Sequence, residues 1–83
     1  MTEYFVHATS LVDGSAEIGS GTKIWQFCNI MGDTNIGENC NIGQGVFVES
    51  EVMVGNRVKI KNNVALLHSS NGNLTAAPSA ADL

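Results

Sequence analysis

This sequence is short of the residues that mark several common protein classes. Its 83 residues include one proline, two cysteines and four lysines or arginines. No apolar run approaches the roughly 20 residues of a transmembrane helix, and the cysteines are too few for a disulfide framework. Eight acidic residues leave a net charge of −4, which argues against a nucleic-acid-binding chain. The N-terminus lacks a secretory signal, so we expect a cytoplasmic protein without membrane or nucleic-acid partners.

An unbroken six-residue repeat occupies most of the chain. Only 19 of the 83 residues are Val, Ile or Leu, yet every sixth residue from Val6 to Leu66 is one of these three. The members are Val6, Val12, Ile18, Ile24, Ile30, Ile36, Ile42, Val48, Val54, Ile60 and Leu66. The residue two places before each, from Ser10 to Val64, is small or β-branched. Such periodicity matches neither a helix nor a heptad.

Each repeat unit predicts a short strand followed by a turn. Side chains two residues apart share one face of a strand, so the small and the aliphatic residue point inward. Three units close into one triangular coil, and equivalent positions of successive coils therefore recur at every third unit. The predicted fold is all-β, a parallel β-helix of a little over three coils within residues 1–66. Residues 67–83 break the repeat, and we expect them to form an irregular or disordered tail.

Nine glycines accompany the single proline, which predicts many similar tight turns. Gly19, Gly37 and Gly55 recur at every third unit, and each follows a corner aliphatic residue. We expect them to stack on one corner, where the backbone adopts a conformation that glycine favours.

Several units resemble the hexapeptide repeat of the left-handed parallel β-helix acyltransferases, among them residues 36–41, 42–47 and 54–59. The left-handed twist is implied by this resemblance. Residues 23–31, 36–45 and 55–64 look like nucleotide-sugar N-acetyltransferases that act on UDP-3-amino-glucuronate derivatives in bacterial O-antigen synthesis. The resemblance covers residues 1–65.

The resemblance implies an acetyl-CoA donor, a nucleotide-sugar acceptor and a homotrimer with sites between adjacent prisms. It also implies further coils that carry most contacts to coenzyme A and the polar residue near the reacting amine. No residue among 67–83 matches them, so we expect an inactive or incomplete fragment and assign no catalytic position. Relatives often have histidine where this chain has Gln26 and Asn29.

Three amides at equivalent positions of successive coils form one candidate substrate-binding group: Gln26, Gln44 and Asn62. They can line a cleft for a uracil or sugar, or form a structural hydrogen-bonded ladder along the stack. Trp25 and Phe27 lie on the same corner, and we expect a subunit interface there rather than a base-stacking platform.

A second candidate group is cationic and comprises Arg57, Lys59 and Lys61, which alternate along one strand and its turn. It can clamp a pyrophosphate. The alternative is a solvated face that protects an open strand edge. The block of acidic residues on another corner, Asp13, Asp33, Glu49 and Glu51, is typical of exposed turns.

Cys28 and Cys40 occupy inward slots, and we interpret them as apolar fillers rather than reactive thiols. His7 and His68 are far apart in the repeat, so we expect no metal site. Besides the acetyltransferase, the sequence leaves open a non-catalytic β-helical module for structure or trimerisation.

Overall fold

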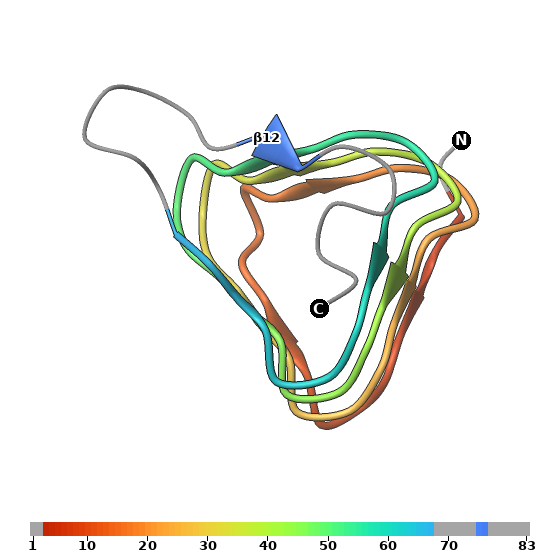
Figure 1. The fold of residues 1–83 in the computed structure, drawn as a ribbon, viewed down its shortest axis with the longest axis vertical. Helices are drawn as coiled ribbons and strands as arrows, with labels where there is room; N and C mark the ends of the chain where they lie inside the picture. Colours follow the sequence, from red (N-terminus) through yellow and green to blue (C-terminus); the bar gives the residue numbers. More distant parts are fainter. Residues whose placement is uncertain (1–2, 68–74, 77–83) are drawn as a thin grey trace.

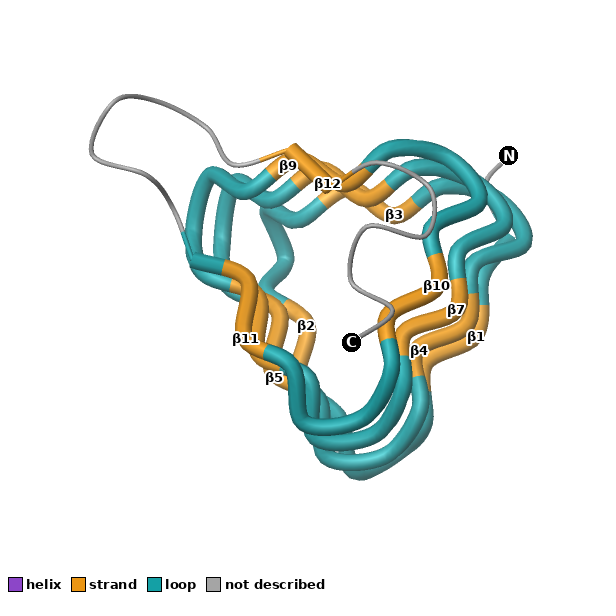
Figure 2. The backbone as a smooth tube through the Cα atoms, in the orientation of Figure 1, coloured by secondary structure: helices purple, strands orange, loops and turns teal. Residues whose placement is uncertain are grey.

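The computed structural model describes residues 3–67 and 75–76, and these form a triangular stack of parallel strands (Figure 1). Within this part of the chain there is no helix, and therefore none that could cross a membrane. The three sides of the triangle are three sheets of four strands each, and corners of four residues connect the strands from β1 to β11 (Figure 2). The predicted all-β parallel solenoid is confirmed.

All strands are two residues long, and each sheet collects every third strand of the chain. Sheet A contains β1 (Phe5–Val6), β4 (Lys23–Ile24), β7 (Asn41–Ile42) and β10 (Lys59–Ile60). Sheet B contains β2 (Leu11–Val12), β5 (Asn29–Ile30), β8 (Phe47–Val48) and β11 (Ala65–Leu66). Sheet C contains β3 (Glu17–Ile18), β6 (Asn35–Ile36), β9 (Met53–Val54) and β12 (Thr75–Ala76).

The pairing register follows the three-unit coil, as Asn41 shows by lying between Lys23 and Lys59. β12 departs from it. The period would put Asn71 beside Met53, but Thr75 occupies that position. Two residues of the expected irregular tail therefore extend sheet C, while 68–74 and 77–83 lie outside the described residues.

The core is the column of inward residues that the repeat predicts. The second residue of each strand from β1 to β11 points inward, and Ile24, Ile42 and Ile60 are completely buried. The first strand residue points outward and is exposed or half-buried in β1 to β11. The small inward residues from Thr22 to Val58 are buried as well. One repeated inward position thus makes one continuous core.

The corner of Gly19, Gly37 and Gly55 requires glycine for a different reason from the one that the sequence suggested. Gly19 and Gly37 are not among the residues with positive φ. A Cβ on Gly19 would lie 2.5 Å from the backbone C and O of Gly37, and one on Gly37 would lie 2.7 Å from those atoms of Gly55. The expectation of a special backbone conformation was wrong. Close approach between stacked coils requires glycine there.

The left-handed backbone conformation falls two residues further along each turn. It recurs once in every repeat unit from Gly21 to Asn63, with φ between 57° and 80°. The occupants are Gly21, Phe27, Asp33, Asn39, Gly45, Glu51, Arg57 and Asn63. Six of them are not glycine, although this region is unfavourable for a bulky residue such as Phe27. The turn geometry therefore overrides local preference.

Side chains also join the coils by accepting hydrogen bonds from turn amides of the neighbouring coil. The buried Thr22 hydroxyl donates to Gly37 O at 2.7 Å and accepts from Cys40 N at 3.1 Å. Asn56 Oδ1 accepts from Glu38 N at 2.8 Å. These bonds satisfy backbone donors that a short strand leaves unpaired.

Candidate functional site

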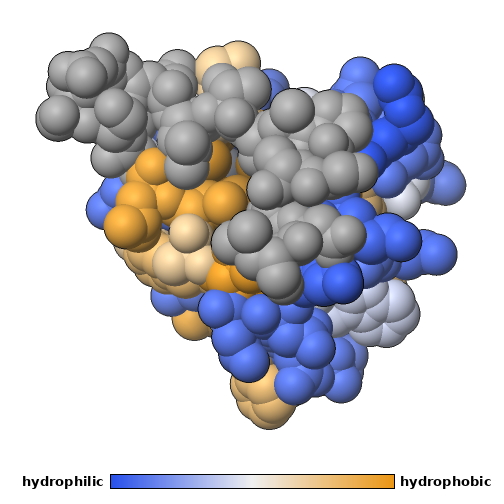
Figure 3. Space-filling view, viewed as in Figure 1, coloured by the Kyte–Doolittle hydropathy of each residue, from blue (hydrophilic) through white to orange (hydrophobic). Residues whose placement is uncertain are grey.

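Every basic side chain of the protein lies on sheet A or on its two flanking corners. Lys23 and Lys59 are on the outer face, in β4 and β10, with Asn41 of β7 between them. Arg57 and Lys61 lie at the two ends of β10, and all four basic side chains are exposed. In Figure 3 the side of β10 is largely hydrophilic, whereas hydrophobic side chains gather towards the side of β11. An acidic protein therefore has one cationic face.

An aromatic pair borders this face at the end where the chain begins. The rings of Phe5 and Trp25 have centroids 5.3 Å apart and are tilted by 55°. Trp25 Nε1 donates to Asn41 Oδ1 at 3.0 Å. Both rings keep part of their surface exposed, with 44% for Phe5 and 37% for Trp25. The pair leaves exposed apolar surface beside the cationic face.

The three predicted amides stack on the corner between sheets A and B. Backbone hydrogen bonds run up this corner, from Gly45 N to Gln26 O and from Asn63 N to Gln44 O, each 2.9 Å long. Asn62 Oδ1 accepts from Gln44 N at 3.1 Å. Its oxygen therefore takes part in holding the coils together. Substrate binding by Gln26, Gln44 and Asn62 stays a prediction.

The structure brings only some of the predicted site residues together. Lys61 adjoins Asn62 on the amide corner, whereas Arg57 lies at the opposite end of β10. Lys23 and Asn41 are not among the residues predicted from the sequence, because the predicted cationic group follows a single strand. Both occupy the same position of the coil as Lys59, so a comparison of residues one coil apart would have found them.

The four acidic residues of the predicted block, Asp13, Asp33, Glu49 and Glu51, occupy the corner between sheets B and C, away from sheet A. Asp13 Oδ1 accepts hydrogen bonds from Ser15 N at 2.9 Å and Ser15 Oγ at 2.8 Å. These bonds hold the pKa of Asp13 below its usual 3.8. Ser15 Oγ also accepts from Asp33 N at 2.9 Å, in the next coil. The carboxylate thereby supports a contact between coils.

Asp13 should make stability sensitive to acid. Because its pKa is lowered by folding, its contribution is present above the unfolded pKa and is lost as the pH falls through the folded one. We expect the melting temperature of the parent protein to fall more steeply below about pH 4 than that of the Asp13→Asn variant. Thermal unfolding followed by circular dichroism over a pH series measures this. Asp33→Asn is the control, and an equal change of slope in both variants would contradict a specific role for Asp13.

Hydrogen bonds to Thr9 orient the imidazole ring of His7. Its Nδ1 lies 2.9 Å from Thr9 Oγ1 and accepts from Thr9 N at 3.2 Å. Thr9 Oγ1 in turn accepts from Phe27 N at 3.0 Å. With Nδ1 accepting, a neutral imidazole carries its proton on Nε2. In that tautomer the second ring nitrogen of His7 is an N–H donor.

The two thiols are buried and free. Cys28 Sγ donates to Gly43 O at 2.9 Å and Cys40 Sγ to Gly55 O at 3.0 Å. Their position agrees with the predicted inward slots. Across residues 3–67 and 75–76, no cluster of three His, Cys, Asp or Glu side chains is placed to hold a metal ion.

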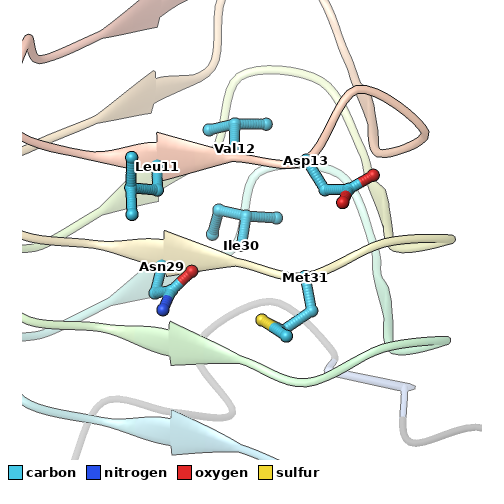
Figure 4. Close-up of a pocket in the computed structure, with 6 residues that line it drawn as sticks. All are labelled: Leu11, Val12, Asp13, Asn29, Ile30 and Met31. Carbon is cyan, nitrogen blue, oxygen red and sulfur yellow. The ribbon is translucent and has the colours of Figure 1, made fainter.

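Shallow hollows occur on every side of the prism, so hollow volume alone marks no site. The hollow in Figure 4 measures about 330 Å³ and lies on sheet B, between β2 and β5. Its lining is Leu11, Val12, Asp13, Asn29, Ile30 and Met31. Others of about 350 and 240 Å³ lie on sheet C and beside β1 and β4. Charge distinguishes the faces better than shape does.

Comparison with known proteins agrees with the repeat. Residues 15–50 match the family model described as bacterial transferase hexapeptide (six repeats). No curated protein matches the chain. The matched segment runs from the second corner of the first coil to the corner that follows β8, inside the stacked coils. Residues 15–50 are therefore similar to the bacterial transferase hexapeptide repeat, and the parallel solenoid agrees with that similarity.

Proposed function

We propose that this chain serves an N-acetyltransferase that moves an acetyl group from acetyl-CoA to the amine of a nucleotide-linked sugar, in the cytoplasmic synthesis of a bacterial surface polysaccharide. The match to a transferase repeat supports the acyltransferase class. The cationic face of sheet A carries the proposal further, because a nucleotide sugar is an anionic substrate and Lys23 and Lys59 lie on an otherwise acidic protein.

The chemistry requires positioning more than a reactive side chain. The amine lone pair attacks the thioester carbonyl carbon, the carbon–sulfur bond breaks, coenzyme A leaves as its thiol and the amine loses one proton. Holding the two substrates in line contributes much of such a rate. In the described part of the chain, the one histidine, His7, already accepts a hydrogen bond from Thr9 N at Nδ1. We therefore assign substrate binding, and no proton transfer, to these residues.

Titration of the purified chain with an aminated UDP-sugar and with acetyl-CoA tests the proposal. We expect calorimetry to detect the nucleotide sugar and a thiol assay to detect no release of coenzyme A, because we assign substrate binding and no catalytic residue to the described part of the chain. Asn35→Asp serves as a folded control on sheet C. Absence of nucleotide-sugar binding by a folded protein would contradict the proposal.

A non-catalytic trimerisation module is the second candidate. Its support is the apolar surface outside the core, above all Phe27 at 70% and Leu11 at 68% exposure. Exposed aromatic and aliphatic side chains are typical of contacts between subunits. Light scattering measures the assembly. A stable trimer that binds neither substrate would favour this candidate, whereas the acetyltransferase proposal expects a homotrimer that binds the sugar nucleotide.

A further inference from the structure

We propose that the outer face of sheet A binds the diphosphate group of a nucleotide ligand through Lys23, Asn41 and Lys59. The diphosphate chemistry follows from this face alone, and only the choice of nucleotide rests on the proposed function. The three residues come from successive coils and were not assigned together by the sequence.

The three side chains form one straight column across three adjacent strands. Lys23 pairs with Asn41, and Asn41 pairs with Lys59, each as the outward residue of its strand. Neighbouring strands are spaced by about 4.8 Å, so the two lysine backbones lie about 10 Å apart. Both ammonium groups, on flexible four-carbon stems, can reach an anion above Asn41.

Asn41 presents a donor to that anion. Trp25 Nε1 is a donor only, so the Asn41 atom that it contacts at 3.0 Å must be the carbonyl oxygen. The NH₂ group is then the part of the amide that remains for another partner. The column therefore carries two ammonium groups and an amide donor, a set of groups that suits phosphate oxygens.

Protection of an open sheet edge does not explain the column. Charged residues blunt edge strands, and β10 is an edge strand of sheet A, so that role could account for Lys59. β4 and β7 are inner strands. Lys23 and Asn41 thus lie where no edge needs protection.

Carboxylates lie on one border of the face, at the corner between sheets C and A. Glu3 lines the hollow that also contains Lys23, and Glu38 shares the corner of Arg57, whose N donates to Glu38 O at 2.8 Å. The outward residues of sheet A include no acid. Repulsion from this border favours binding above Asn41 rather than beside Arg57.

The aromatic border fits the rest of a nucleotide. Tyr4 and Phe5 line the hollow of about 240 Å³ beside Lys23, and Trp25 packs on the other side of Phe5. Nucleobases stack on exposed aromatic rings without needing a specific hydrogen-bond pattern. A base at this border leaves its diphosphate next to the column.

Calorimetric titration with inorganic pyrophosphate at low salt tests the site, with the chain otherwise unchanged. We expect binding that weakens as salt is added. The Lys23→Gln and Lys59→Gln variants should each lose about tenfold in affinity, and Asn41→Ala about fivefold. Asn35→Asp on the outer face of sheet C lowers the net charge by the same one unit as Lys→Gln, and it should retain affinity. Circular dichroism confirms that each variant is folded.

The outcome distinguishes this site from the proposed function. Equal affinities in Asn35→Asp and the two lysine variants would overturn the site, as would the absence of pyrophosphate binding. UDP and coenzyme A, titrated separately, identify the source of the diphosphate, and a loss of either one's affinity in Lys23→Gln supports the site. If pyrophosphate binds at the column but the aminated UDP-sugar does not bind, the site stands and the proposed function fails.

Discussion

The Gly37→Ala variant is expected to lose about 3 kcal/mol or more of its free energy of unfolding. The added methyl carbon would lie 2.7 Å from both the carbonyl carbon and the carbonyl oxygen of Gly55 in the next coil. It would also meet the side chain of Asn56, whose oxygen accepts a hydrogen bond from Glu38 N. Backbone atoms in a stacked coil cannot move without opening the stack. The lost free energy of unfolding therefore comes from the separation of two coils.

Urea unfolding measures this loss, and the melting temperature should fall by roughly 15 °C. Gly14→Ala is the matched control, because its added carbon would meet nothing within 4 Å and its φ is not positive. A glycine replaced by alanine in a compatible conformation stabilises slightly, by about 0.4 to 1 kcal/mol, through the unfolded chain. Similar stabilities for the two variants would show that the coils adapt to a side chain at position 37.

The core could be predicted from the sequence because a single physical requirement repeats in it. Every inward position must be apolar or small, so the column that includes Ile24 and Ile42 is visible as a period of six. The order of strands in each sheet followed from the coil length of three units. β12 could not be predicted, because Thr75–Ala76 pairs with β9 outside the period of the coil.

The turn conformation could not be predicted because no single residue type marks it. The left-handed position is occupied by residues as different as Phe27, Glu51 and Arg57. Glycine marks a different position, where Gly19 and Gly37 pack directly on the next coil. The recurring glycines thus indicate a close approach between coils, and not the special backbone conformation that the sequence suggested. Only the three-dimensional stack separates these two causes.

Only part of the candidate site could be predicted, because its residues are close in space but far apart in the sequence. Arg57 and Lys61 are close in sequence and were grouped, yet they lie at opposite ends of β10. Lys23 and Lys59 are two full coils apart along the chain, and one strand separates them in space. In a solenoid, the outward neighbours of a residue are found one coil away. Charges must therefore be compared between equivalent positions of successive coils.

The Ile42→Ala variant is expected to lose about 2 to 5 kcal/mol of unfolding free energy. Ile42 is completely buried and lies between Ile24 and Ile60 in sheet A, so the void would open at the middle of the stack. Each coil contacts only its neighbours, which means that a void in a central coil weakens two interfaces at once.

Urea unfolding of Ile42→Ala should be compared with Glu17→Ala, which removes an exposed side chain on the outer face of β3. The control should change stability by no more than about 0.5 kcal/mol. A loss in Ile42→Ala as small as that of the control would mean that the inward column does not hold the coils together. The backbone ladder and the side-chain bonds of Thr22 and Asn56 would then have to carry the cohesion of the stack.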